Sequence, residues 1–273
     1  MKRAMFISRN LIGDGLNISP ALRAWYADHQ DWEIDLLTNP DQIAPLYERM
    51  GVPLHLVYAQ NDKAYGIYDF AFDFDCGKAF SIGEMTGKHI TTCYAMMLGV
   101  DISKERKPTY EPFEEDHEKD LVLVSVFSKS CSSREGLPPN KMLPWDKVSR
   151  ILPLLRQAGR IGVLGAEGDQ VPIFKDSGCN VVENEYYLGL PLNKVALMLR
   201  DCKMLFTIDN GVSHLAASQN TRSVVLYPAC LDPRWIAPIG NENAVIVHAD
   251  PKSVPVAALL RMIREQMSRW NVL

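Results

Sequence analysis

The sequence contains no apolar run that approaches the roughly 20 residues needed to cross a bilayer. Its first residues turn polar at Ser8-Arg9-Asn10, too early for the apolar core of a secretory signal. Six cysteines are scattered without a Cys-x-x-Cys pair, which argues against a zinc site and against a disulfide framework. We therefore expect a cytoplasmic protein with free thiols, no metal site and no transmembrane segment.

The composition is that of a globular protein. The 273 residues are 47% hydrophobic and 23% charged, which is enough to bury one large core or two ordinary ones. The net charge is only -4, but it is unevenly distributed: up to Asp116 there are 11 Lys and Arg against 18 Asp and Glu, and after it 18 against 15. The basic second half suits a phosphate-bearing ligand, whereas the acidic first half makes nucleic acid an improbable partner.

The first part of the chain alternates strands and helices, which predicts a parallel sheet with right-handed crossovers. Strands are expected at residues 4–8, 34–38, 52–57 and 68–74, and helices at residues 18–28, 42–50 and 85–98. Residues 78–84 are interpreted as a loop. His89, near the start of the third predicted helix, is expected to be an ordinary surface side chain, although it could contact a ligand.

Residues 101–120 are charged, contain two prolines and lack apolar periodicity, so they predict a linker. We place a domain boundary near residue 115, giving domains of residues 1–115 and 116–273. In the second domain we expect strands at residues 121–127, 161–164, 180–182, 205–208 and 224–227, and helices at residues 144–157, 192–200 and 254–270 and from Ser213 onward. The apolar face of the last helix suits packing back on the first domain or against a partner subunit.

Two loops that follow predicted strands carry candidate functional residues. The first contains Gly13-Asp14-Gly15, where we expect the glycines to free the backbone so that the Asp14 carboxylate projects above the strand. The loop is not a Gly-x-Gly-x-x-Gly dinucleotide fingerprint. On spacing alone, Asp14 could instead merely cap the helix.

The second loop is Asp209-Asn210-Gly211, between a buried strand and an apolar helix. The carboxyl ends of parallel strands are where open α/β sheets bind ligands, and the N-terminus of a helix attracts anions such as a diphosphate. We expect Ser213 to be the N-cap of this helix and His214 to lie in its first turn.

Four sequence elements, taken in order along the chain, resemble glycosyltransferase family 9, the heptosyltransferase-like enzymes. Leu11-Ile12-Gly13-Asp14 with Pro20-Ala21-Leu22 resembles the family's "LGD…PAL" start. Residues 141–145, KMLPW, are similar to its "K-x-W-P" element. Residues 209–217, DNGVSHLAA, resemble its "DTGxSHLAA" signature, and Leu226-Tyr227-Pro228 takes the place of "LFG".

The resemblance implies a GT-B architecture, in which two Rossmann-like domains with parallel sheets face each other. The first domain would bind an acceptor and the second a nucleotide-sugar donor, ADP-heptose-like or other. The reaction implied is an inverting transfer to a hydroxyl of a glycan acceptor, such as lipopolysaccharide or another surface glycan, without metal or cofactor. Asp73-Phe74-Asp75 matches the letters of a metal-binding Asp-x-Asp but falls in the acceptor domain.

Roles for individual residues follow from the same resemblance. Asp14 matches the general base, supported by Gly13 and Gly15. Asp209 and Glu167 would accept hydrogen bonds from hydroxyls of the donor sugar, and His214 would support the turn or reach a phosphate. The residues that would face the diphosphate are Ser128, Lys129, Lys141, Asn210, Gly211, Val212 and Ser213.

Departures from the family pattern keep other functions open. Asn210 replaces a small hydroxyl residue, Pro228 replaces a glycine, and Phe127-Ser128 stands where many relatives have proline-glycine. The alternatives are a glycosyltransferase that acts on hydroxymethylated bases of phage DNA, a sugar-nucleotide epimerase of GT-B architecture, and a nucleotide-sugar binding protein without catalysis. An epimerase would convert donor alone, and a binding protein would not need Asp14.

Overall fold

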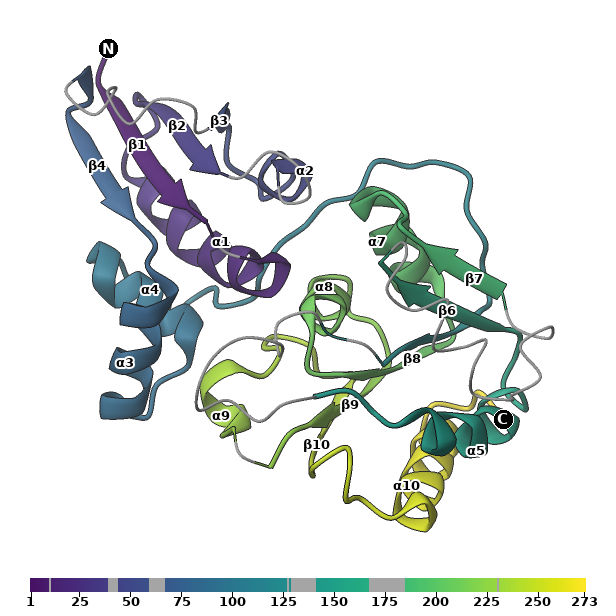
Figure 1. Ribbon diagram of the computed structural model, residues 1–273. Coiled ribbons are helices and arrows are strands. Elements are labelled where there is room, and N and C mark those ends of the chain that lie inside the picture. Colours follow the sequence, from purple (N-terminus) through teal and green to yellow (C-terminus); the bar gives the residue numbers. More distant parts are fainter. Residues whose placement is uncertain are drawn as a thin grey trace. The chain divides into compact units, whose positions relative to one another are not determined.

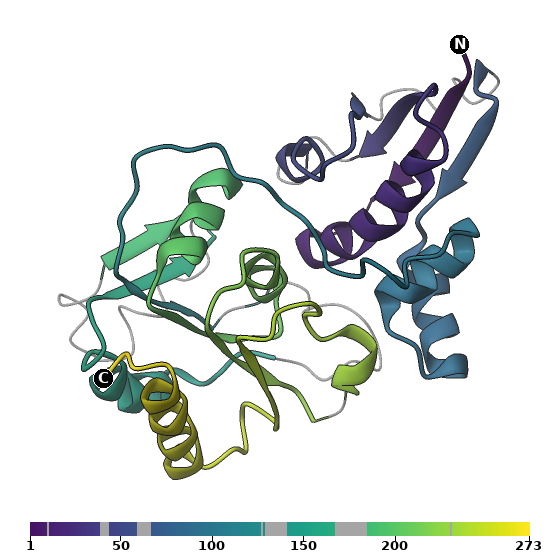
Figure 2. The same cartoon turned by 180° about the vertical axis from the view of Figure 1, so that it is seen from behind.

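The computed structural model describes residues 1–9, 11–38, 44–58, 67–126, 128, 141–166, 185–229 and 231–273. The chain forms two compact units, of which the first is drawn mainly in purple to blue and the second mainly in teal to yellow in Figure 1 and Figure 2. The first unit comprises Met1–Pro112 and Arg234–Gly240, and the second comprises Phe113–Pro233 and Asn241–Leu273. Each unit is built on its own parallel sheet.

The first unit has a four-stranded sheet of order β3-β2-β1-β4 in which every pair is parallel. Trp25 packs edge-to-face on Phe6 with ring centroids 5.0 Å apart, which fixes the first helix against the first strand. The elements are β1 (Arg3–Ser8), α1 (Ile12–Ala27), β2 (Glu33–Thr38), α2 (Ala44–Tyr47), β3 (His55–Tyr58), β4 (Phe70–Asp73), α3 (Cys76–Thr86) and α4 (Ile90–Leu98).

Two helices of the first unit correct the sequence-based assignment. The helix expected from residue 18 begins at Ile12, and the loop expected at residues 78–84 lies inside helix α3. Asp75 caps α3 by accepting a hydrogen bond from the backbone N–H of Lys78 at 3.0 Å, and Gly87 ends it with φ 67°. Glycines inside both helices made these segments resemble loops.

The segment Arg234–Gly240 belongs to the first unit although it follows β9 in the sequence. His89 is the N-cap of α4, where its Nδ1 accepts a hydrogen bond from the backbone N–H of Thr91. Its Nε2 therefore carries the proton and donates to the carbonyl of Ala237 at 2.8 Å. His89 is thus a structural residue and not the free surface side chain that the sequence suggested.

The second unit has a six-stranded sheet of order β10-β9-β8-β5-β6-β7, again with every pair parallel. The strand expected at residues 180–182 lies outside the described residues. The elements are β5 (Val122–Ser125), α5 (Trp145–Leu155), β6 (Ile161–Gly165), β7 (Glu185–Leu188), α7 (Leu192–Asp201), β8 (Met204–Ile208), α8 (Gly211–Ser218), β9 (Ser223–Tyr227), β10 (Ala244–His248) and α10 (Val256–Arg269); the short α9 (Pro233–Ile236) leads out of the unit.

Helix α10 packs on α5 within the second unit, side by side with it in both views (Figure 1, Figure 2). Leu259, Ile263 and Met267 are fully buried in the same apolar cluster as Ile151 and Leu155. This contact accounts for the apolar face of the last helix, which the sequence had suggested would pack on the first domain or on a partner.

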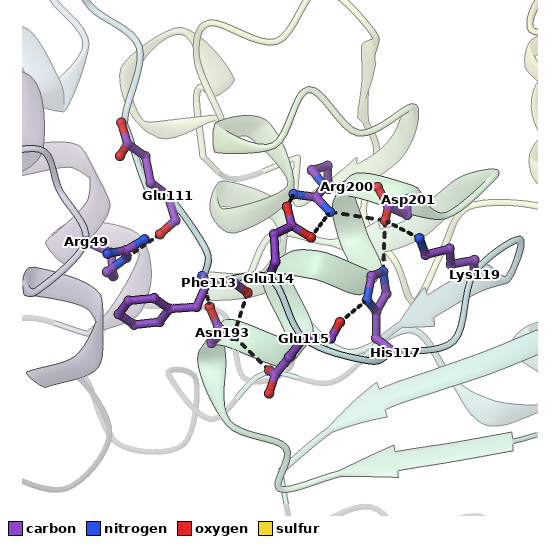
Figure 3. Close-up of polar contacts among 10 residues, drawn as sticks. All are labelled: Arg49, Glu111, Phe113, Glu114, Glu115, His117, Lys119, Asn193, Arg200 and Asp201. Carbon is purple, nitrogen blue, oxygen red and sulfur yellow. Dashed lines mark hydrogen bonds and ion pairs between the residues drawn. The ribbon is translucent and has the colours of Figure 1, made fainter.

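The residues before and after Pro112 in the linker are hydrogen-bonded to different units: Glu111 to the first unit and Phe113 to the second (Figure 3). In the first unit, the backbone N–H of Glu111 donates to the carbonyl of Arg49 at 3.0 Å, and Arg49 Nε donates to the carbonyl of Glu111 at 2.5 Å. In the second unit, the backbone N–H of Phe113 donates to Asn193 Oδ1 at 2.5 Å, and Asn193 Nδ2 donates to the carbonyl of Phe113 at 3.1 Å. The two compact units meet between Pro112 and Phe113, three residues before the predicted boundary.

Charged side chains bind the rest of the linker to α7 (Figure 3). Arg200 donates to both carboxylate oxygens of Glu114, at 2.6 and 3.1 Å. His117 Nε2 lies 2.9 Å from Asp201 Oδ2. Hydrogen bonds from Arg200 and His117 lower the pKa of Asp201, against the effect of its burial. The charged linker is therefore anchored to the C-terminal end of α7.

Candidate functional site

Both sheets have a topological switch point. In the second sheet the chain runs from β5 through β6 to β7 on one side, and β8 then pairs with β5 on the other side. In the first sheet β1 is flanked by β2 and β4 in the same way. Ligands of open α/β sheets bind at the carboxyl ends of the two strands beside such a switch. Asp14 follows the end of β1, and Asp209 follows the end of β8.

Asn210, the residue that departs from the family pattern, is the N-cap of α8. Its side-chain Oδ1 accepts a hydrogen bond from the backbone N–H of Ser213 at 3.0 Å, and Ser213 Oγ accepts the backbone N–H of Asn210 at 3.4 Å. The two residues form a capping box. The expectation that Ser213 is the N-cap is wrong, because the helix starts two residues earlier than expected, at Gly211.

The capping box changes which backbone groups can contact an anion. The N–H of Ser213 is already bonded to Asn210, so Ser213 does not offer the donor that was predicted. Gly211 and Val212 are the first two helical residues, and their N–H groups have no acceptor within the helix because the helical hydrogen-bond ladder begins later. An anion at the N-terminus of α8 would therefore be contacted by the N–H groups of Gly211 and Val212 and not by that of Ser213.

Lys141 and Asp209 form a buried ion pair at the same switch point. Lys141 Nζ lies 2.5 Å from Asp209 Oδ2, and the two side chains are only 15% and 6% exposed. Lys141 precedes α5, and Asp209 directly follows β8. The sequence predicted both residues as part of the donor site but did not predict that they contact each other. Their pairing places a cation beside the N-terminus of α8.

His214 lies buried in the first turn of α8, near this pair. Burial lowers the pKa of His214 to about 4; the nearby Asp209 carboxylate opposes this effect and the Lys141 cation adds to it. The imidazole is therefore neutral at pH 7. Its Nδ1 is buried without a hydrogen-bond partner in the described part of the chain. A neutral histidine here adds no charge that would compete with the pair.

In the first unit, Asp14 lies in the first turn of α1 and is half-buried. Gly13 and Gly15 are helical and do not form the flexible loop that was predicted. A Cβ atom on Gly15 would meet Leu46 Cδ2 at 2.7 Å and Tyr47 Oη at 3.1 Å. Glycine at this position therefore leaves room for the close packing of α2 against α1, within a helix and not in a turn.

Two buried tyrosines near Asp14 were not identified from the sequence. Tyr47 Oη lies 2.5 Å from Ser8 Oγ at the end of β1. Burial raises the pKa of Tyr47 to about 12, and the Asp14 carboxylate adds to this increase. Burial also raises the pKa of Tyr94, again with a contribution from Asp14. Both phenols therefore stay protonated near neutral pH.

Several predicted site residues lie outside the described part of the chain. Lys129, Glu167 and Phe127 lie outside the described residues. Ser128 is described and half-buried. Within the described ranges no three His, Cys, Asp or Glu side chains gather as metal ligands would, and no helix there is long and apolar enough to cross a membrane. Among the described residues, Cys76, Cys93 and Cys202 take part in no disulfide.

Residues 131–258 match the family model described as glycosyltransferase family 9 (heptosyltransferase). The fold is similar to that of a family 9 glycosyl transferase from Veillonella parvula DSM 2008, with a TM-score of 0.72, 13% identity, and 98% of this chain and 97% of that chain covered. The fold is also similar to that of E. coli ADP-heptose LPS heptosyltransferase II, with a TM-score of 0.74 and 16% identity. That comparison covers 98% of this chain and 99% of the heptosyltransferase. E. coli heptosyltransferase WaaC with ADP is similar with a TM-score of 0.69 and 14% identity, and the comparison covers 97% of this chain and 99% of WaaC. Comparison with curated proteins gives no match. The predicted α/β fold of GT-B class is confirmed.

Proposed function

We propose that the chain is a glycosyltransferase similar to the family 9, heptosyltransferase-like enzymes, and that it transfers a sugar from a nucleotide-sugar donor to a hydroxyl of a glycan acceptor. The observation that carries this proposal is the Lys141–Asp209 pair beside the N-terminus of α8, at the switch point of the second sheet. A nucleoside diphosphate is the leaving group that this arrangement suits.

The donor side is supported by charge and geometry. The N–H groups of Gly211 and Val212 and the dipole of α8 favour a negatively charged group. Lys141 adds a full positive charge, and Asp209 holds that charge in place. As the sugar–phosphate bond breaks, negative charge builds up on the departing diphosphate, and these fixed donors stabilise it. Asp209 also carries carboxylate oxygens that can accept hydrogen bonds from sugar hydroxyls.

Asp14 is proposed as the general base. Its position in the first turn of α1 favours the ionised carboxylate, since the helix dipole is positive there. The acceptor oxygen attacks the anomeric carbon, the bond from that carbon to the diphosphate breaks, and the acceptor proton passes to Asp14. Attack opposite the leaving group inverts the anomeric configuration. The step needs only these groups, so we propose that it proceeds without a metal ion.

ADP-heptose is the donor to test first, since solved structures of WaaC contain ADP and ADP-2-deoxy-2-fluoro heptose. The purified protein is incubated with ADP-heptose, with and without a panel of hydroxyl-bearing glycans, and ADP release is followed in the presence of EDTA. We expect release that depends on the glycan and is unaffected by EDTA. Conversion of the donor without any glycan would instead indicate an epimerase. No reaction with any nucleotide sugar would contradict the proposal.

A further inference from the structure

Asn210 does more than cap α8. Its side-chain nitrogen Nδ2 points across to the end of β5 and donates to Ser125 Oγ at 3.2 Å, with the Ser125 carbonyl at 3.4 Å. Its oxygen Oδ1 holds the N–H of Ser213 at 3.0 Å. One amide thus joins the first turn of α8 to the neighbouring strand at the switch point.

Only an amide of this length can make both contacts. A serine or threonine hydroxyl can accept the capping hydrogen bond, but its single short oxygen does not extend to the next strand. An aspartate would keep the cap and lose the donor. The residue that replaces the family's small hydroxyl therefore adds a contact between strands while preserving the helix start.

The neighbouring contacts show that this connection is part of a buried network. Thr207 Oγ1 donates to the Ser125 carbonyl at 2.7 Å, so Ser125 is held from β8 as well as from the turn that follows β8. Ser125 and Thr207 are 2% and 0% exposed. Buried polar networks of this kind restrict the relative positions of the backbone segments that they connect.

We propose that Asn210 is a positioning residue for donor binding. It acts through Ser125 to fix the N–H groups of Gly211 and Val212 relative to the carboxyl end of β5. These are the two strand ends between which a diphosphate would bind. The inference rests on the proposed function, because it assumes that a nucleoside diphosphate binds at this switch point.

The test compares variants that keep the cap with variants that lose it. Asn210→Thr and Asn210→Ser retain an N-cap acceptor and remove the amide donor, whereas Ser125→Ala removes the Oγ acceptor on β5. The affinity of each protein for ADP, GDP, UDP and CDP is measured by calorimetry, and its melting temperature is measured without ligand. Asn210→Ala, which removes both contacts, shows how the melting temperature responds to loss of the cap.

We expect Asn210→Thr to bind the preferred diphosphate roughly tenfold more weakly than the wild type, with a melting temperature close to that of the wild type. Asn210→Thr should weaken binding little further in the Ser125→Ala background, because the two changes break the same contact. A lower melting temperature with unchanged affinity would mean a purely structural role and would overturn the inference. So would additive effects of the two changes on affinity.

Failure of the inference is distinguishable from failure of the proposed function. If the wild type binds a diphosphate and Asn210→Thr and Asn210→Ser bind it equally well, the inference is wrong and the proposed function stands. If the folded wild type binds none of the four, the proposed donor site is wrong and the inference falls with it.

Discussion

Lys141 Nζ lies 2.5 Å from Asp209 Oδ2, although 68 residues separate the two in the sequence. Both side chains are largely removed from water, so each charge depends on the other for compensation. The pair joins the segment before α5 to the turn after β8. This turn lies at the topological switch point of the second sheet, where the strand order reverses between β5 and β8.

Replacing one member of the pair should destabilise the protein more than replacing both. Lys141→Met leaves the Asp209 carboxylate buried without its cation, and we expect a loss of about 3 kcal/mol in the free energy of unfolding. Adding Asp209→Asn removes the uncompensated charge and should restore stability to within about 1 kcal/mol of the wild type. Urea denaturation of the three proteins measures these differences. Additive losses would show that the pair is not coupled.

Asp14→Asn should abolish transfer while leaving donor binding intact. The amide has the shape of the carboxylate but cannot accept the acceptor proton, so we expect kcat to fall by about 10²- to 10⁴-fold. Because Asp14 belongs to the first unit and the donor residues to the second, affinity for the nucleoside diphosphate should not change. Steady-state rates and calorimetry check the two parts. Wild-type turnover by Asp14→Asn would exclude the general-base role.

Burial of His214 predicts that stability depends on pH in a defined window. The pKa of His214 falls from its ordinary 6.5 to about 4 in the folded protein, so between these values the unfolded state binds a proton that the folded state does not. Stability conferred by the neutral ring is complete above pH 6.5 and is lost as the pH falls toward 4. The resulting decrease in the free energy of unfolding, summed over this pH range, is about 3 kcal/mol.

His214→Gln isolates this contribution, because glutamine does not titrate and can still occupy a polar position. Free energies of unfolding are measured for both proteins at pH 7.5, 6 and 5, and the difference between their slopes cancels other titrating groups. We expect the wild type to lose more stability than the variant on acidification. Parallel slopes would mean that His214 is protonated as readily in the folded protein as in the unfolded one.

Asn193 should control the accessibility of the linker. Its side chain holds both backbone groups of Phe113 and donates to Glu115 Oε1 at 2.7 Å. Asn193→Ala removes these contacts, and we expect a Glu-specific protease to cleave after Glu114 or Glu115 at least tenfold faster, because local opening becomes easier. Lys194→Ala, at the next position of α7, is the matched control. Equal cleavage rates for the two variants would contradict the anchoring role.

Much of the fold was predictable because its strands are short apolar runs. The strands β1, β2, β5, β8 and β9 each coincide with a buried, partly β-branched segment, as parallel strands require. Helices α1 and α3 were misjudged where glycine occurs inside them. Gly15 leaves room for Leu46 and Tyr47 of α2, a tertiary contact that the low helix propensity of glycine does not reveal.

Individual residues of the candidate site could be selected from the sequence, but the contacts among them could not be predicted. Asp14, Lys141 and Asp209 were identified from motifs, whereas the contact between Lys141 and Asp209 depends on how distant segments pack. The capping role of Asn210 was missed because serine is also a good N-cap, and the motif alone does not show where the helix starts. Tyr47 gave no signal in the sequence, since its proximity to Asp14 exists only in the fold.

We propose that the switch point of the second sheet binds the diphosphate of a nucleotide sugar. The most direct test of this proposal is a calorimetric titration of the wild type and of the Lys141→Met/Asp209→Asn double variant with ADP, GDP, UDP and CDP, under conditions where both proteins are folded. The wild type should bind at least one diphosphate with clear preference, and the equally stable double variant should bind it at least 100-fold more weakly, as expected for loss of a charge-assisted contact. Equal affinity of the two proteins, or no binding by the wild type, would contradict the account.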